Sequence, residues 1–375
     1  MPGPHAPATQ TSDPRPTQRP HVAAAVEDWW CTVAGAFLRR RGWVPRVLPY
    51  TGYGTPRGVR VLARVLLVPP SRARGPLSPV RHADRRPLRS YLTLPAPGER
   101  LRVAVGGAVV DVATDRAGYV DVEVALPDDA PLPPGRHDAT LTALRAERHA
   151  TASAVAPAIA PVVASVVVVG DDATFGVVSD IDDTAMVTAV PRPFVAAWNT
   201  FVTRASARRP VPGMPALYRR LAAEHPDAPF VYLSNGAWNT AGTLARFLDR
   251  HGFPPGPLLL TDWGPTQTGW FRSGPQHKGD SLDRLMIAFP RVRWLLVGDA
   301  GQLDEDVYVR AAARWPGRVV AIAVRQVDGA RPRPSRGRPD PGAPLVHGAD
   351  GTELGARLDA VLDPRHQRSG TNPDS

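Results

Sequence analysis

The sequence predicts an α/β protein in which a parallel sheet with helices on both faces follows a small antiparallel β-sandwich domain. Two observations predict this order. Between residues 45 and 150, short runs of alternating apolar and polar residues are separated by Gly, Pro and Asp, which is the pattern of half-exposed antiparallel strands. Between residues 174 and 327, wholly apolar strands alternate with helical stretches, which indicates a parallel sheet covered by helices.

The length and composition fit two folded domains with irregular ends. The chain has 375 residues, more than a single core usually supports, and 43% of them are hydrophobic. The one cysteine, Cys31, permits no intrachain disulfide. We see no signal peptide and no apolar run long enough to cross a membrane, so the expected location is cytoplasmic, with peripheral association at a membrane surface.

The formal net charge of +10 favours anionic partners, among them nucleic acid, anionic lipid and phosphorylated metabolites. The charge by itself does not choose among these classes. Much of the excess lies in arginine-rich ends such as RPRPSRGRPD, so compositional drift explains the charge equally well.

The N-terminal region divides into a tail and a helix. Residues 1–21 are rich in Pro, Thr and Gln and predict a disordered tail. Residues 22–44 predict a helix, because Trp29, Trp30 and Phe37 recur at helical spacing before a run of three arginines. Two interpretations stay open: this helix packs on the body of the protein, or it lies in a lipid interface.

Four further ranges complete the predicted organisation. Residues 45–150 form the sandwich, of transthyretin or immunoglobulin type, and carry no cluster of catalytic residue types, so we interpret this domain as a binding or scaffolding module. Residues 151–173 form a linker and a leading strand. Residues 174–327 form the catalytic α/β domain, and residues 328–375 form a Pro- and Arg-rich tail with one short helix.

Three apolar strands of the α/β domain end at polar residues, which places those residues at the carboxyl edge where parallel sheets bind ligands. The first, FGVVSDIDDT, carries Asp180, Asp182 and Thr184. Alternation sends both carboxylates to one side, where one can attack phosphorus and the other can protonate the leaving oxygen beside a metal ion. A calcium loop is the competing interpretation, but Ala185 and Pro191 occupy the positions that need Gly and Glu.

The other strand ends supply polar and charged partners. Ser234 and Asn235 offer a hydroxyl and an amide to an anion, although Ser-Asn after a strand is also an ordinary turn or helix cap. Lys278 is the only lysine among 45 basic residues, and an ammonium group can contact a phosphoryl oxygen and the nucleophile together; a retained surface lysine is the alternative. Asp299 and Asp304 are placed to complete a metal shell.

Together these motifs resemble the haloacid dehalogenase (HAD-like) superfamily, whose phosphatases carry DxDxT, then Ser or Thr, then Lys, then Gly with paired acids. The segments VVSDIDDT, VPGMPALYRRL, SNGAW, HKGDSL and VGDAGQLDEDVY are similar to the catalytic domain of the actin-patch-associated phosphatidate phosphatase family. The resemblance implies a Rossmannoid fold, Mg²⁺ and hydrolysis of phosphatidate to diacylglycerol. Ala300 stands where such sequences usually have Ser, and Gly236 and Ala237 stand where they have Ser-Pro, which bears on substrate choice.

The expected mechanism is attack by Asp180 to give an aspartyl phosphate, with Asp182 protonating the leaving oxygen and then activating water. Thr184 supports the loop. The alternatives are a phosphatase for another phosphomonoester, either a soluble metabolite or a nucleic-acid end, and a catalytically silent lipid-binding module. The residues expected at the site are the catalytic group Asp180, Asp182, Thr184, Ser234 and Lys278, the phosphate-binding group Ser234, Asn235 and Lys278, and the metal ligands Asp180, Asp182, Asp299 and Asp304.

An insertion between the first two strand ends bears on the partner. Phe194, Trp198 and Phe201 recur there at roughly helical spacing. Facing outward they suit acyl chains or a bilayer, and facing inward they pack on the domain; both interpretations stay open. The expected partner is an anionic phospholipid substrate at a membrane surface. We do not expect nucleic acid as a partner, and the oligomeric state is left open.

Overall fold

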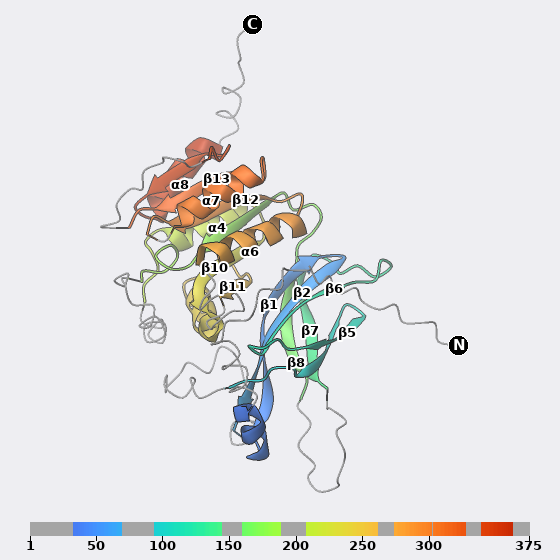
Figure 1. The fold of residues 1–375 in the computed structure, drawn as a ribbon. Coiled ribbons are helices and arrows are strands. Elements are labelled where there is room, and N and C mark those ends of the chain that lie inside the picture. Colours follow the sequence, from blue (N-terminus) through green and yellow to red (C-terminus); the bar gives the residue numbers. More distant parts are fainter. Residues whose placement is uncertain are drawn as a thin grey trace.

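The computed structural model describes residues 33–69, 94–144, 160–188, 208–261, 274–301, 303–327 and 339–362. The predicted fold class is confirmed: a curled, mostly antiparallel sheet precedes a parallel sheet with helices on both faces (Figure 1). The predicted tail over 1–21, the residues Trp29 and Trp30, and the aromatic insertion lie outside the described residues.

In the part of the chain that the structure describes, the N-terminal sheet has eight strands. Alternation along them separates core from solvent as the sequence predicts: in β4, Leu101, Val103 and Val105 are buried, whereas Arg100 and Arg102 are exposed. The strands follow the order β3-β2-β1-β8-β7-β4-β5, with β6 paired to β2, and among these described strands only β1 and β8 run parallel to each other. They are β1 (Val44–Thr55), β2 (Gly58–Val68), β3 (Leu94–Pro95), β4 (Arg100–Val105), β5 (Ala108–Ala113), β6 (Tyr119–Ala125), β7 (Gly135–Ala143) and β8 (Val162–Val168).

Two features of this sheet differ from a simple sandwich followed by a linker. All eight strands belong to one sheet that curls around its own core, so the two faces expected of a sandwich are parts of one ladder. The leading strand expected within 151–173 is β8, and it pairs with β1 and β7 of this sheet. Periodicity identifies a strand but does not identify its neighbours.

The parallel sheet defines the α/β domain. Its order is β11-β10-β9-β12-β13-β14, which in chain order is 3-2-1-4-5-6, the doubly wound arrangement. The chain leaves β9 for one half of the sheet and later returns to its other side, so the crevice for ligands opens at the carboxyl ends of β9, β10 and β12. The strands are β9 (Phe175–Asp180), β10 (Phe230–Ala237), β11 (Leu258–Thr261), β12 (Arg293–Asp299), β13 (Val319–Arg325) and β14 (Leu345–Gly348).

Helices cover both faces of this sheet. α6 and α7 pack against each other on one face, and α4 and α8 pack against each other on the other (Figure 1). In α4, the buried Met214, Leu217, Tyr218 and Leu221 form one apolar stripe at helical spacing. The helices are α4 (Met214–Glu224), η4 (Trp238–Thr240), α5 (Ala241–Arg250), α6 (Gly274–Ala288), α7 (Asp304–Arg314) and α8 (Gly351–Leu362).

The stretch interpreted as a C-terminal tail contributes to this domain. Within 339–362, β14 adds the last strand beside β13, and α8 buries Leu354 and Leu358 against the sheet. The apolar spacing of α8 indicates a helix. A four-residue strand between Pro- and Gly-rich segments has no comparable periodic signal.

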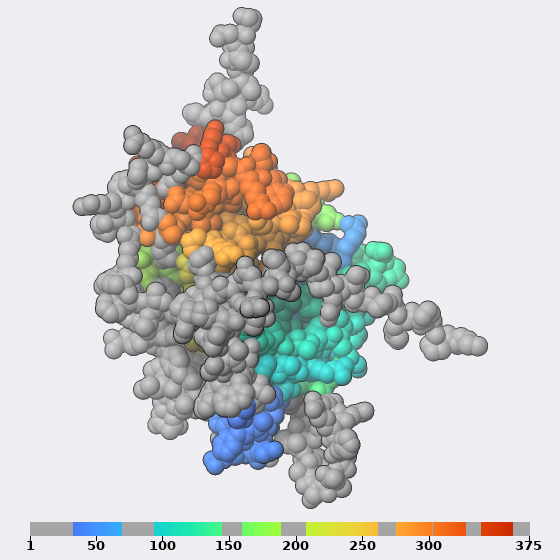
Figure 2. Space-filling model, in the orientation of Figure 1, coloured from blue at the N-terminus to red at the C-terminus, as the bar shows by residue number. Residues whose placement is uncertain are grey.

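The two domains share packing. Tyr50, Tyr53 and Leu62 of the N-terminal sheet belong to the same core as the α/β domain, whereas the rest of that sheet surrounds a core of its own. In the space-filling view, the teal atoms of the N-terminal sheet lie below the orange atoms of the α/β domain (Figure 2). Residues 33–40 are helical, and the described Phe37 is half exposed beneath the Arg41 guanidinium, 4.5 Å from its ring centre.

Candidate active site

The loop after β9 carries the first two acids. Asp180 is the last residue of the strand and is fully buried. The turn behind it is fixed by backbone hydrogen bonds from Ala185 to Ile181 (3.0 Å) and from Asp183 to Met186 (2.8 Å). Asp183 adopts φ 55°, and its carboxylate accepts a hydrogen bond from the Thr188 amide (2.8 Å), so this third acid supports the loop.

Lys278, near the start of α6, lies between two carboxylates. Its Nζ donates to Asp180 Oδ1 (2.6 Å) and to Asp304 Oδ1 (2.5 Å), and its side chain is 1% exposed. Burial lowers the pKa of Lys278, but the two carboxylates outweigh burial and raise it above its ordinary value. This excludes a retained surface lysine, because the ammonium group is charged and buried beside the predicted nucleophile.

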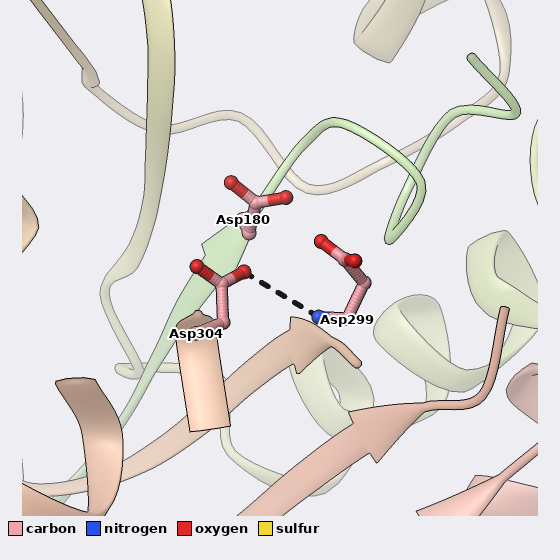
Figure 3. Close-up of side chains that lie close together, drawn as sticks. All are labelled: Asp180, Asp299 and Asp304. Atoms are coloured by element: carbon pink, nitrogen blue, oxygen red, sulfur yellow. Dashed lines mark hydrogen bonds between the residues drawn. The ribbon is translucent and has the colours of Figure 1, made fainter. Parts of the chain in front are cut away.

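Asp180, Asp299 and Asp304 form the carboxylate cluster, with ligand atoms within 4.8 Å of one another. They come from the end of β9, the end of β12 and the start of α7, and the Asp299 amide donates to Asp304 Oδ2 (3.4 Å; Figure 3). The Oδ2 atoms of Asp180 and Asp299 are buried and make no hydrogen bond to any described residue. Buried carboxylate oxygens without donors fit a divalent cation, so the cluster is compatible with a metal site.

The electrostatics of the cluster point the same way. Burial raises the pKa of Asp180 well above its ordinary value, with Lys278 opposing. Burial and the charge of Asp304 raise the pKa of Asp299 to about 8. Both shifts report an excess of buried negative charge, which a proton or a cation relieves.

Asp182 and Ser234 form the second part of the site. Ser234 Oγ donates to Asp182 Oδ2 (2.8 Å) and accepts from the Gly236 amide (2.9 Å). Burial raises the pKa of Asp182 to about 6, although the Ser234 hydroxyl opposes the shift. A carboxyl group that titrates near neutral pH suits general acid and base chemistry. The side chain of Asp182, expected as a metal ligand, is not part of the carboxylate cluster.

Two other predicted residues lie around this centre. Thr184 is buried, and its hydroxyl makes no hydrogen bond to the described residues. Asn235 follows Ser234 in β10, and its carbonyl accepts from Thr261 Oγ1 (2.7 Å). The structure therefore brings every predicted site residue to the carboxyl edge of the sheet.

Three residues at the site escape sequence reasoning. Tyr218 of α4 hydrogen-bonds Ser179 (2.6 Å), behind Asp180. Arg325 at the end of β13 donates to the Asp183 carbonyl (2.7 Å). The half-buried Arg208 lies near enough to Asp182 and Asp183 for their charges to act on its pKa. Arg208 and Arg325 lie in none of the quoted motif segments, and Tyr218 lies in VPGMPALYRRL, where nothing in the sequence shows that its hydroxyl reaches Ser179.

The comparisons with known proteins fall on this same region. Residues 175–326 match the family model described as "Phosphatidate phosphatase APP1, catalytic domain". The match confirms the resemblance predicted from the motifs, and it contains all of the predicted site residues. It covers the chain from β9 to the residue after β13.

Two curated relatives match over similar lengths. Phosphatidate phosphatase APP1 of Saccharomyces cerevisiae is 28% identical over 151 residues, which is 40% of this chain and 25% of that protein. An uncharacterized protein of Schizosaccharomyces pombe is 25% identical over 162 residues, 43% of this chain and 26% of that protein. The chain thus spans about a quarter of the length of these relatives.

Solved structures are more distant. The HAD domain of effector protein Lem4 from Legionella pneumophila aligns at a TM-score of 0.31 and 12% identity, over 51% of this chain and 95% of that chain. Phosphoserine phosphatase from T. onnurineus aligns at a TM-score of 0.29 and 15% identity, over 51% of this chain and 96% of that chain. Because these TM-scores are low, the description of the fold rests on the strand order alone.

Proposed function

We propose that the chain is a Mg²⁺-dependent phosphohydrolase that forms an aspartyl phosphate on Asp180. The observation that carries the proposal is the buried pairing of Asp180 with Lys278 at the carboxyl edge of the sheet. Burying an ion pair beside carboxylate oxygens that lack hydrogen-bond donors costs free energy. Such costly arrangements of charge occur mainly at functional sites.

The chain's own residues account for both half-reactions. An Asp180 oxygen attacks phosphorus, the ester P–O bond breaks, and Asp182 transfers its proton to the departing oxygen. Asp182, now a base, takes a proton from water, whose oxygen attacks the aspartyl phosphate and releases inorganic phosphate. Lys278 and the Ser234 hydroxyl stabilise charge on the phosphoryl oxygens.

The carboxylate cluster is where Mg²⁺ would be held, by Asp180 and Asp299 with Asp304 beside them. When bound, the ion supplies positive charge that offsets the carboxylates and the phosphoryl group. Asp304 also accepts a hydrogen bond from Lys278, so it keeps the ammonium group directed toward Asp180. Asp182 takes part through proton transfer, as its contact with Ser234 supports.

The proposed substrate is phosphatidate, hydrolysed to diacylglycerol and phosphate at a membrane surface. The family match and the similarity to the yeast phosphatidate phosphatase support this choice. Among the described helices, none is long and apolar enough to cross a membrane. We propose that the lipid is met at the surface of a bilayer. We also propose a cytoplasmic location with peripheral membrane association.

The test is phosphate release from short-chain phosphatidate and from a small aryl phosphate, with Mg²⁺ or with chelator, for the wild type and Asp180→Asn. We expect Mg²⁺-dependent release that the substitution abolishes, and a preference for phosphatidate. Release from the aryl ester alone would indicate another phosphomonoester as substrate. Release from neither, in a folded protein, would contradict the phosphohydrolase proposal and favour a silent lipid-binding module.

A further inference from the structure

The last four residues of β10, residues 234–237, carry Ser234 and Asn235 and depart from regular strand pairing; we call this segment the turn. The pairing of β10 with β11 shifts register between Leu233 and Ala237, so residues 234–236 leave the regular ladder. Within this segment, the Ser234 hydroxyl donates to Asp182 Oδ2 (2.8 Å). Gly236 lies within the turn and adds backbone freedom. The geometry of the turn therefore depends on contacts from outside the strand.

Two hydroxyl groups hold the backbone of this turn. Thr261 Oγ1 at the end of β11 donates to the Asn235 carbonyl (2.7 Å), and Thr240 Oγ1 donates to the Ala237 carbonyl (2.7 Å). Both contacts come from within the α/β domain. Neither fixes the side chain of Trp238, which follows the turn directly.

Trp238 is held by the N-terminal sheet. The Tyr50 ring in β1 lies against it with centroids 4.4 Å apart, and the Tyr119 ring at the start of β6 lies 6.2 Å away. Arg64 of β2 covers Tyr119 at 4.5 Å. A register shift in β1 falls between Tyr50 and Tyr53, and a bulge of this kind redirects the side chains beside it.

We propose that Tyr50 is a positioning residue for the phosphohydrolase site: by packing on Trp238, it fixes the turn that presents Ser234 to the phosphoryl group. The N-terminal sheet thereby takes part in substrate binding without contacting the substrate. The inference rests on the proposed function, because it assigns a task to a turn whose hydroxyl binds phosphate in that reaction. Displacement of a binding group by about 1 Å lowers rates by roughly 100-fold, so loss of the ring contact has a measurable effect.

The experiment compares three variants of the full chain. Tyr50→Ala removes the contact, Tyr50→Phe keeps the ring, and Tyr53→Ala is the matched control. Tyr53 is also a buried tyrosine of β1 in the interface between the domains, but its ring lies 6.0 Å from Phe289, at the amino end of β12 and the opposite edge of the sheet from the site.

For each variant we would measure kcat and KM for an aryl phosphate, the Ki for inorganic phosphate and the melting temperature. We expect Tyr50→Ala to lower kcat/KM roughly 10- to 100-fold and to raise the Ki, with Tyr50→Phe restoring both. Tyr53→Ala should lower the melting temperature and leave the kinetic constants of the folded enzyme unchanged. Equal kinetic constants for Tyr50→Ala and Tyr53→Ala would overturn the proposal.

Hydrogen exchange provides a readout that needs no activity. The Gly236 amide is hydrogen-bonded to Ser234 Oγ, so amides of the segment 230–241 should exchange faster in Tyr50→Ala and not in Tyr53→Ala. If the wild type hydrolyses no phosphate ester, the proposed function fails, while the exchange rates still decide whether Tyr50 positions the turn. Unchanged exchange in Tyr50→Ala, together with wild-type kinetics, would show that the ring contact has no positioning role.

Discussion

Replacing Lys278 with methionine removes the buried cation and keeps a side chain of similar length. The ammonium group lies 2.6 Å from Asp180 Oδ1 and 2.5 Å from Asp304 Oδ1. All three side chains are buried. Its loss leaves two buried carboxylates facing each other. Removing one partner of a buried pair costs roughly 3–5 kcal/mol, because the remaining charge is uncompensated.

In a domain of this size each kcal/mol lowers the melting temperature by about 2–4 °C, so Lys278→Met should melt roughly 6–20 °C below the wild type in chelator. The assay is thermal unfolding followed by circular dichroism. Added Mg²⁺ should recover part of the loss, since a divalent cation also compensates the carboxylates. The control is Arg314→Met, which breaks the exposed ion pair with Asp283 (2.9 Å) and should cost no more than about 1 kcal/mol. If Lys278→Met and Arg314→Met have the same melting temperature, the reasoning from a buried ion pair is refuted.

Three other changes test the site. Saturating Mg²⁺, at about 100 times its Kd, should stabilise the wild type by about 2.7 kcal/mol, and Asp299→Asn should abolish this shift in thermal unfolding; an undiminished shift would place the ion elsewhere. Gly298→Ala puts a Cβ 2.7 Å from the Cβ of Asp304 and should cost about 1–3 kcal/mol by the same measurement, whereas Gly279→Ala in α6 meets nothing within 4 Å and should be neutral or stabilising. Ser234→Ala should lower kcat/KM about 100-fold in the phosphate-release assay with little change in melting temperature, and full activity would exclude the hydroxyl from phosphate binding.

Much of the candidate site was predictable from the sequence because Asp180, Ser234 and Asp299 stand at or near strand ends. An apolar run that stops at Asp180, another at Ser234 and a third at Asp299 define three strands and, in a parallel sheet, one shared edge. The only lysine of the chain stands out by composition alone. For these residues, position along the chain determines position in space.

Contacts between elements were not predictable in this way. The hydrogen bond of Tyr218 to Ser179 and the ring contact of Tyr50 with Trp238 join residues that are far apart in the sequence. They depend on which faces of a helix and a curled sheet meet, and periodicity carries no information on that pairing. For the same reason, the four-residue strand β14 was interpreted from the sequence as part of a tail: its place in the sheet depends on pairing with β13, which periodicity does not show.

The charge balance of the site argues for a divalent ion more directly than the ligand types do. Three buried carboxylates, those of Asp180, Asp299 and Asp304, carry three negative charges when ionised, and Lys278 supplies one positive charge, which leaves two negative charges inside the protein. Burying uncompensated charge is expensive, so without an ion the carboxylates take up protons, as the pKa of about 8 for Asp299 reflects. A protonated Asp180 would be a poor nucleophile. In the proposed reaction, one divalent cation would neutralise the remainder and keep Asp180 ionised, so the carboxylates proposed to bind the ion would also hold the proposed nucleophile in its reactive form.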